Sequence, residues 1–281
     1  MTALPTTSLA QPDTDLSWIG EVASACLEQE AMTYPKPGLV SHVDSGAHRD
    51  MDCALLFRSA RTLAPYFGTL AVAGSRGAAM DRLRIIGLAA EAAMLNATSG
   101  TNTHRGAIFG LGLLCAAAGT RAAFGLKRSL GELVAERWGA AILAGPIPLH
   151  SHGTMAGRRY GAGGARLEAS LGLPSVYTIA LPALRTGRCL APNDEEAARV
   201  QACMTLIAHV TDTNLLHRGG HDGLAFAQAQ AQTFLATGGV GHRDWRAHAT
   251  SIHLAFVERN LSPGGCADLL AMALFVDRME R

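Results

Sequence analysis

The chain has 281 residues, of which 48% are apolar and only 5% aromatic, and its formal net charge is +1. This length suffices for one large domain, and the few aromatic residues imply a core built mainly from Ala, Leu, Val, Ile and Met. The near-neutral charge argues against a general nucleic-acid or membrane-surface binder, which would carry a basic excess. Any anionic ligand must therefore be held by a local site.

Cysteine usage and hydropathy favour a soluble cytoplasmic protein. The six cysteines are scattered without a CxxC pair, which is typical of reduced thiols in a chain of this size. Residues 1–20 contain no apolar segment of the kind found in signal peptides. The longest apolar run, Ala107–Ala118, is too short to span a bilayer, which needs about 20 residues. We read it as a buried helix and expect no membrane partner.

The first half of the chain shows helical patterns separated by clear breaks. Residues 1–13 are expected to form a disordered tail before a single helical catalytic domain over residues 14–281. The first helix should run from Leu16 to Met32 and end at the Pro-rich turn Tyr34–Gly38. Asp50 is placed to cap a helix that runs to about Phe67. Further helices are predicted over Ala78–Leu95, His104–Ala118 and Leu130–Leu143.

The second half begins with the least regular stretch, Gly145–Arg188, which contains a strand-like Val176–Ile179. Acidic residues at Asn193–Glu196 indicate a helix start, and that helix should end near Leu216. The remaining helices are expected near Gly223–Ala236, over Asp244–Glu258, and from Ser262-Pro263 to Met279. The sequence therefore predicts an all-α fold, a single compact multi-helix domain whose Gly/Pro-rich loops form the site.

Polar residues crowd into four segments at the predicted helix ends: Ser41–Asp52, Asn102–Arg105, Asp212–Gly220 and Ser262–Gly265, with Asp268 one turn further. Helix starts with small residues are natural phosphate sites, and nearby carboxylates suit Mg²⁺. Purely structural interpretations stay open, because Asp50 and Asn102 are also good caps and Gly264-Gly265 also allows close helix packing. No P-loop or dinucleotide-binding motif is present. From the residues alone we expect a helical enzyme with a phosphorylated ligand.

The same segments resemble the triphosphoribosyl-dephospho-CoA synthase family. The matching blocks follow one another from Pro35 to Leu270: Pro35–Val40, Ser45–Asp52, Thr101–Phe109, Asp212–Asn214 with Arg218–Gly220, and Glu258–Gly265 with Ala267–Leu270. The residues of the segments Val40–Ser45 and Thr98–Thr101 are more similar to those of the malonate-decarboxylase branch than to those of the citrate-lyase branch. Five ordered blocks are far more specific than any single motif.

The resemblance implies an all-helical enzyme that joins ATP to 3′-dephospho-CoA. The expected products are 2′-(5″-triphosphoribosyl)-3′-dephospho-CoA and free adenine. This product is the precursor of a prosthetic group, which another transferase would attach to an acyl carrier protein. Because the N-glycosidic bond of ATP breaks, the transition state should resemble an oxocarbenium ion.

Roles for individual residues follow as hypotheses from this chemistry. Glu91 is the candidate base or oxocarbenium stabiliser, and His104 the candidate proton donor to adenine, since histidine normally titrates near neutral pH. Substrate binding, chiefly to phosphates, is assigned to Lys36, Asn102, Arg105, Arg218, Ser262, Gly264 and Gly265. Mg²⁺ is the expected cofactor, with Asp50, Asp52 and Asp212 as its candidate ligands.

Three alternatives stay open at this point. The same reaction could serve citrate lyase instead of malonate decarboxylase. A nucleotide N-glycosidic hydrolase would use water in place of dephospho-CoA. A non-catalytic helical partner of a decarboxylase complex would use the same motif blocks as an interaction surface. A homodimer is compatible with each of these.

Overall fold

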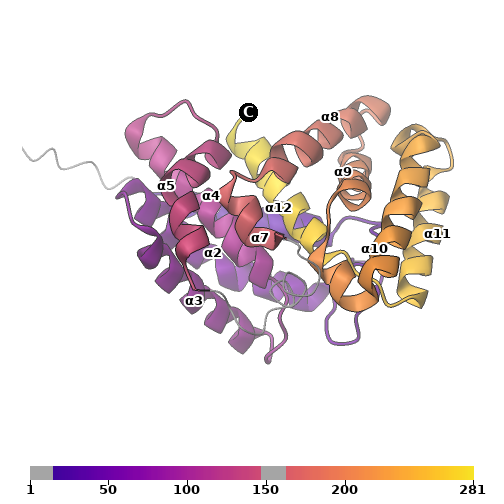
Figure 1. The fold of residues 1–281 in the computed structure, drawn as a ribbon, viewed down its shortest axis with the longest axis horizontal. Coiled ribbons are helices and arrows are strands. Elements are labelled where there is room, and N and C mark those ends of the chain that lie inside the picture. The colour runs from indigo at the N-terminus through magenta and orange to yellow at the C-terminus, as the bar shows by residue number, and fades with distance from the viewer. Residues whose placement is uncertain (1–14, 147–162) are drawn as a thin grey trace, which may run out of the picture.

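The computed structural model describes residues 15–146 and 163–281, and the tail expected at residues 1–13 lies outside this part of the chain. The described residues form eleven α-helices and contain no strand, so the all-α prediction is confirmed (Figure 1). The α-helices are α1 Ser17–Ala31, α2 Cys53–Ser75, α3 Met80–Ala97, α4 Arg105–Phe124, α5 Leu130–Ala144, α7 Gly164–Ser170, α8 Leu181–Leu190, α9 Glu195–His209, α10 Thr213–Ala236, α11 Trp245–Glu258 and α12 Gly264–Met279. A π-helix, Ser175–Ala180, precedes α8, and a short 3₁₀ turn, Gly239–Gly241, precedes α11.

Helix α4 is the central helix of the N-terminal half and packs against α2, α3, α5 and α12. Figure 1 shows α12, in yellow, crossing the middle of the molecule, with α10 and α11 at one end. By length and composition alone α4 is apolar enough to cross a membrane, but 72% of its apolar window is buried inside the fold. The prediction of a buried core helix at Ala107–Ala118 is therefore confirmed.

Small residues let α2 and α4 approach until their backbones touch. A Cβ atom on Gly74 would lie 1.9 Å from the carbonyl oxygen of Ala116, and one on Gly119 equally close to that of Ala71. No side chain fits at such a distance. Gly74 and Gly119 are therefore required for the close packing of α2 against α4.

The start and end of α2 differ from the prediction. Its N-cap is Asp52, whose Oδ1 accepts a hydrogen bond from the Leu55 N–H at 2.8 Å, whereas Asp50 lies two residues earlier in the loop. A cap must directly precede the first helical residue to reach these amides, and only Asp52 does so. The helix also continues past Phe67 to Ser75, because Leu70 and Ala71 bury their side chains in the core.

Two predictions in the second half are wrong. Val176–Ile179 is not a strand but part of the π-helix, which runs directly into α8. The strand preference of such residues depends on a neighbouring strand, and the described part of the chain offers none. The helix expected to end near Leu216 ends at His209, and α10 begins after Asp212 and reaches Ala236 with a kink at Gly220, where the backbone is not helical.

Candidate active site

The N-terminal ends of α4, α10 and α12 open into one cavity of about 1370 Å³, which α2, α3, α5 and α7 also line. Pockets for a single small molecule usually occupy about 300–1,000 Å³, so this cavity has room for two nucleotide-sized ligands. Most of the predicted site residues line it: Asp50, Glu91, Asn102, His104, Arg105, Asp212, Arg218, Ser262, Gly264 and Gly265. Of the residues assigned from the sequence, only Lys36 and Asp52 lie elsewhere.

Asp212 joins the starts of two of these helices. Its Oδ1 accepts hydrogen bonds from the N–H groups of Asn214 and Leu215 at 2.7 and 3.1 Å, which caps α10. Its Oδ2 accepts from the Cys266 N–H, in the first turn of α12, at 2.8 Å. The carboxyl group is buried, and burial raises its pKa despite these hydrogen bonds. Asp212 therefore joins the starts of α10 and α12 as well as lining the cavity. We call the end of the cavity formed by the starts of α4, α10 and α12 its polar end.

Glycines at the same helix starts make room for carboxylates. A Cβ on Gly265 would lie 2.9 Å from Oδ2 of Asp212, and a Cβ on Gly106 would lie 2.0 Å from Oδ2 of Asp268. Asp268, one turn into α12, therefore rests against the first turn of α4. Its pKa is raised well above the usual range by burial and by the nearby charges of Glu30 and Asp212.

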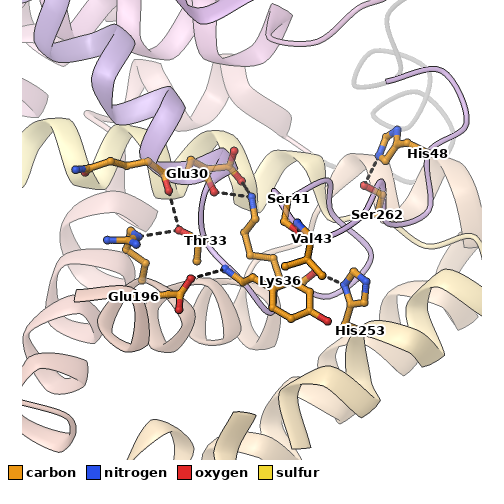
Figure 2. Close-up of polar contacts among 12 residues, drawn as sticks. Glu30, Thr33, Lys36, Ser41, Val43, His48, Glu196, His253 and Ser262 are labelled. Atoms are coloured by element: carbon orange, nitrogen blue, oxygen red, sulfur yellow. Dashed lines mark hydrogen bonds and ion pairs between the residues drawn. The ribbon is translucent and has the colours of Figure 1, made fainter. Parts of the chain in front are cut away.

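The sequence hypotheses gave no role to Glu30 or Asp268. Both line the cavity, and Asp268 belongs to the block Ala267–Leu270 that carried the resemblance, which was the available signal. Glu30 lies at the end of α1, outside every motif, and only the fold brings it here. Lys36 does not line the cavity: its side chain is buried, and its ammonium group pairs with the Glu30 carboxylate (Figure 2). The Lys36 Nζ also donates to the Glu30 carbonyl oxygen at 2.6 Å.

The fit of these carboxylates to a divalent cation can be judged from their surroundings. Among the described residues no three His, Cys, Asp or Glu side chains are arranged as a ready-made metal site. Asp52 has one oxygen committed to capping α2. Asp212, by contrast, is buried and Asp268 half-buried at the cavity wall, and the charge of Asp212 helps to raise the pKa of Asp268. Oxygen donors that repel each other are suited to Mg²⁺, which needs only one or two carboxylates when phosphates complete its shell.

Glu91 and Arg105 form an ion pair on the wall of the cavity. The Glu91 Oε1 accepts from the Arg105 Nε at 2.7 Å and lies 2.6 Å from its Nη2, so one carboxylate oxygen of α3 contacts two nitrogens at the start of α4. The Asn102 side-chain oxygen accepts from the Arg105 N–H at 3.2 Å, so Asn102 also helps to begin α4. This pair places one negative and one positive group together at the wall of the cavity.

His104 precedes α4 and is buried at the polar end of the cavity. Its Nδ1 lies 2.7 Å from the Ser59 hydroxyl, which in turn accepts a hydrogen bond from Thr103. Burial, helped by the positive charge of Lys36, lowers the His104 pKa to about 4. The imidazole is therefore neutral at pH 7, and it can donate a hydrogen bond but does not carry the extra proton of an imidazolium acid.

This lowered pKa predicts a loss of stability in mild acid. In the unfolded chain the pKa of His104 is near 6.5. Between pH 7 and pH 5 the unfolded state therefore binds a proton at His104 that the folded state does not bind, which favours unfolding. The contribution of His104 to the free energy of unfolding should fall by about 2 kcal/mol between pH 7 and pH 5. Urea denaturation of the native protein and of His104→Asn at both pH values measures it. A difference between the two proteins that does not change with pH would contradict the assignment.

Arg218 is held at the edge of the cavity by the loop before α2. Its Nη1 donates to the Ala47 and Asn260 carbonyl oxygens at 3.0 and 3.2 Å, and its Nη2 lies 3.3 Å from His48 Nδ1. His48 Nε2 is in turn 2.8 Å from the Ser262 hydroxyl (Figure 2). Burial lowers the pKa of both His48 and Arg218. Arg218, His48 and Ser262 thus form one preorganised donor group, with the Asp50 carboxylate nearby at 3.6 Å from His48 Nδ1.

Comparison with known proteins decides the family. Residues 16–281 match the family model described as ATP:dephospho-CoA triphosphoribosyl transferase. The chain belongs to this family. It is 42% identical to a probable 2-(5″-triphosphoribosyl)-3′-dephosphocoenzyme-A synthase of Azotobacter vinelandii, over 99% of this chain and 94% of that protein. It is 40% identical to the synthase of Klebsiella pneumoniae, over 94% of this chain and 95% of that protein. No solved structure matches.

The family prediction is thus confirmed, and with it the prediction that the protein is a transferase. The names of the relatives refer to neither malonate nor citrate, so the branch stays a prediction. The matched region includes every described helix, and therefore all the cavity walls given above.

Proposed function

We propose that the protein transfers the 5-triphosphoribosyl group of ATP to the 2′-hydroxyl of 3′-dephospho-CoA and releases adenine. The observation that carries this proposal is the cavity itself. In a chain of this family, one space large enough for two nucleotides gathers three helix N-termini, two arginines and several carboxylates at one end. We extend the proposal to malonate decarboxylase as the system served and to the cytoplasm as the location, on the sequence resemblance and composition given above.

We assign phosphate binding to the hydrogen-bond donors at the polar end of the cavity. Arg105 and the preorganised Arg218, with the Asn102 amide and the Ser262 hydroxyl, offer charged and neutral hydrogen-bond donors to the phosphates of both substrates. Because Gly264 and Gly265 have no side chains, a phosphate can approach the backbone N–H groups at the start of α12. We assign Lys36 to holding the Glu30 carboxylate in place, because its ammonium group is buried and paired there.

Magnesium fits this end of the cavity as part of the nucleotide substrate. We assign its protein contacts to Asp212 and Asp268, with Asp50 at the rim, and leave Asp52 as the cap of α2. When bound, the ion would neutralise charge on the triphosphate and reduce the repulsion between the carboxylates. The protein's own contribution is to hold these oxygens at the cavity wall through the hydrogen bonds that fix Asp212.

The chemical step needs a negative group near the ribose and a partner for the departing base. In the proposed reaction, a bond forms between the 2′-oxygen of dephospho-CoA and C1′ of the ATP ribose, while the bond from C1′ to adenine breaks. Glu91 accepts the hydroxyl proton and stabilises the developing positive charge on the ribose. Neutral His104 donates a hydrogen bond to adenine as it leaves, and the proton lost by the hydroxyl ends on the released base.

Adenine release tests the proposal. The purified protein with ATP and Mg²⁺ should release adenine only when 3′-dephospho-CoA is present, as measured by chromatography of bases and nucleotides. Adenine in the absence of dephospho-CoA would identify a nucleotide hydrolase instead. ADP or AMP in place of adenine would show that phosphate bonds are being cut, which excludes the proposed transfer.

A further inference from the structure

The cavity has an apolar half that the proposed chemistry does not use. Apolar side chains from α3, α5 and the region of α7 line it, among them Met80, Leu83, Leu88, Leu143, Leu167 and Leu171. Leu88, Leu143 and Leu171 are also among the most exposed large apolar residues of the described chain, at 60%, 54% and 63%. Exposed leucines that converge on a cavity are typical of a site whose ligand covers them.

One face of α3 connects this apolar half to the proposed catalytic residues. Met80, Arg84, Leu88 and Glu91 follow one another at helical spacing and all line the cavity. At about 1.5 Å per residue, the face from Met80 to Glu91 is about 16 Å long. A ligand that reacts beside Glu91 can therefore extend along α3 as far as Met80 without leaving the cavity.

We propose that this α3 face binds the pantetheine arm of dephospho-CoA. The inference rests on the proposed function, because dephospho-CoA is the substrate with such an arm, whereas ATP carries none. An extended arm has the backbone length of about four residues, or about 14 Å, which matches the length of the face. Its dimethyl group would cover the leucines, and the Arg84 guanidinium, which lines this half, can donate to its amide carbonyls. The arm thus explains both the apolar character and the length of the site.

The substitution Leu88→Glu tests this assignment. It places a charge on the exposed apolar surface while keeping a residue that favours helix, so the fold should not change. The KM for dephospho-CoA should rise about tenfold, which is the effect of losing contact with one well-covered leucine, while the KM for ATP should stay the same. The matched control is Ile85→Glu, because Ile85 lies on the same helix, is 59% exposed and does not line the cavity.

A second probe separates the arm from the rest of the substrate. 4′-Phosphopantetheine should inhibit competitively against dephospho-CoA, and the Leu88→Glu variant should bind it about tenfold more weakly than the native protein and the Ile85→Glu control. Equal KM for dephospho-CoA in both variants, or inhibition by the probe that Leu88→Glu leaves unchanged, would overturn the assignment. Absence of any transfer by the native protein would instead reject the proposed function, so the two failures are distinguishable.

Discussion

Replacement of Asp212 by alanine should lower the free energy of unfolding by about 3 kcal/mol and abolish activity, the largest stability effect expected at this site. The carboxylate caps α10 through Asn214 and Leu215 and also accepts from Cys266 of α12. Losing a cap costs about 1 kcal/mol, and a buried N–H left without a partner costs about 1–3 kcal/mol more. Urea denaturation followed by circular dichroism measures the change.

Asp52→Ala is the matched control, because Asp52 is also an N-cap but an exposed one with a single hydrogen bond. It should cost only about 1 kcal/mol and leave the dependence of activity on Mg²⁺ unchanged. A loss in Asp212→Ala no larger than that in Asp52→Ala would mean that Asp212 does not join the two helix starts. Full activity with ordinary Mg²⁺ dependence in Asp212→Ala would reject its proposed contact with the ion.

Replacement of Glu91 by glutamine should reduce kcat by about 10²–10⁴-fold, the range typical of a lost general base. Glutamine keeps the shape of the side chain and an oxygen that can accept from Arg105, but it removes the negative charge beside the reacting ribose. Since Glu91 and Arg105 are both partly exposed, the free energy of unfolding should change by no more than about 1 kcal/mol. Steady-state kinetics with varied ATP and dephospho-CoA measures the effect.

The control for this substitution is Glu136→Gln, which breaks the exposed ion pair with Arg128 away from the cavity. It should have native kinetics. A Glu91→Gln variant with a raised KM and native kcat would mean that Glu91 helps to bind substrate but not to transform it. A variant with native values for both would remove Glu91 from the mechanism.

The sequence predicted the helical fold well because helix signals are local. Proline and glycine breaks, acidic starts and the Ala-rich run of α4 each depend on a few neighbouring residues, and most helices begin within about two residues of the predicted position. The errors arose where a choice depended on distant contacts. The strand-like Val176–Ile179 had no strand to pair with, and α2 continued past Phe67 because its next turns pack against α4.

The site residues were predictable as a set but not as pairs. The motif blocks identified most of the polar residues assigned to the cavity, yet spacing could not show that Lys36 turns inward to Glu30 or that Asp268 rests on Gly106. The second contact joins α4 and α12, which only the folded chain brings together. The prediction for His104 relied on an ordinary pKa, and burial, which a sequence does not reveal, lowers that pKa to about 4.

The most direct test of the proposed transfer follows two parts of ATP at once. ATP labelled with ¹³C in the ribose and with ³²P in the γ-phosphate is incubated with the protein, Mg²⁺ and 3′-dephospho-CoA, and the acceptor product is isolated. The proposed function predicts that both labels reach the product in equal amounts and that one adenine is released for each. Ribose label without the γ-phosphate, or both labels left on a free sugar triphosphate, would contradict it.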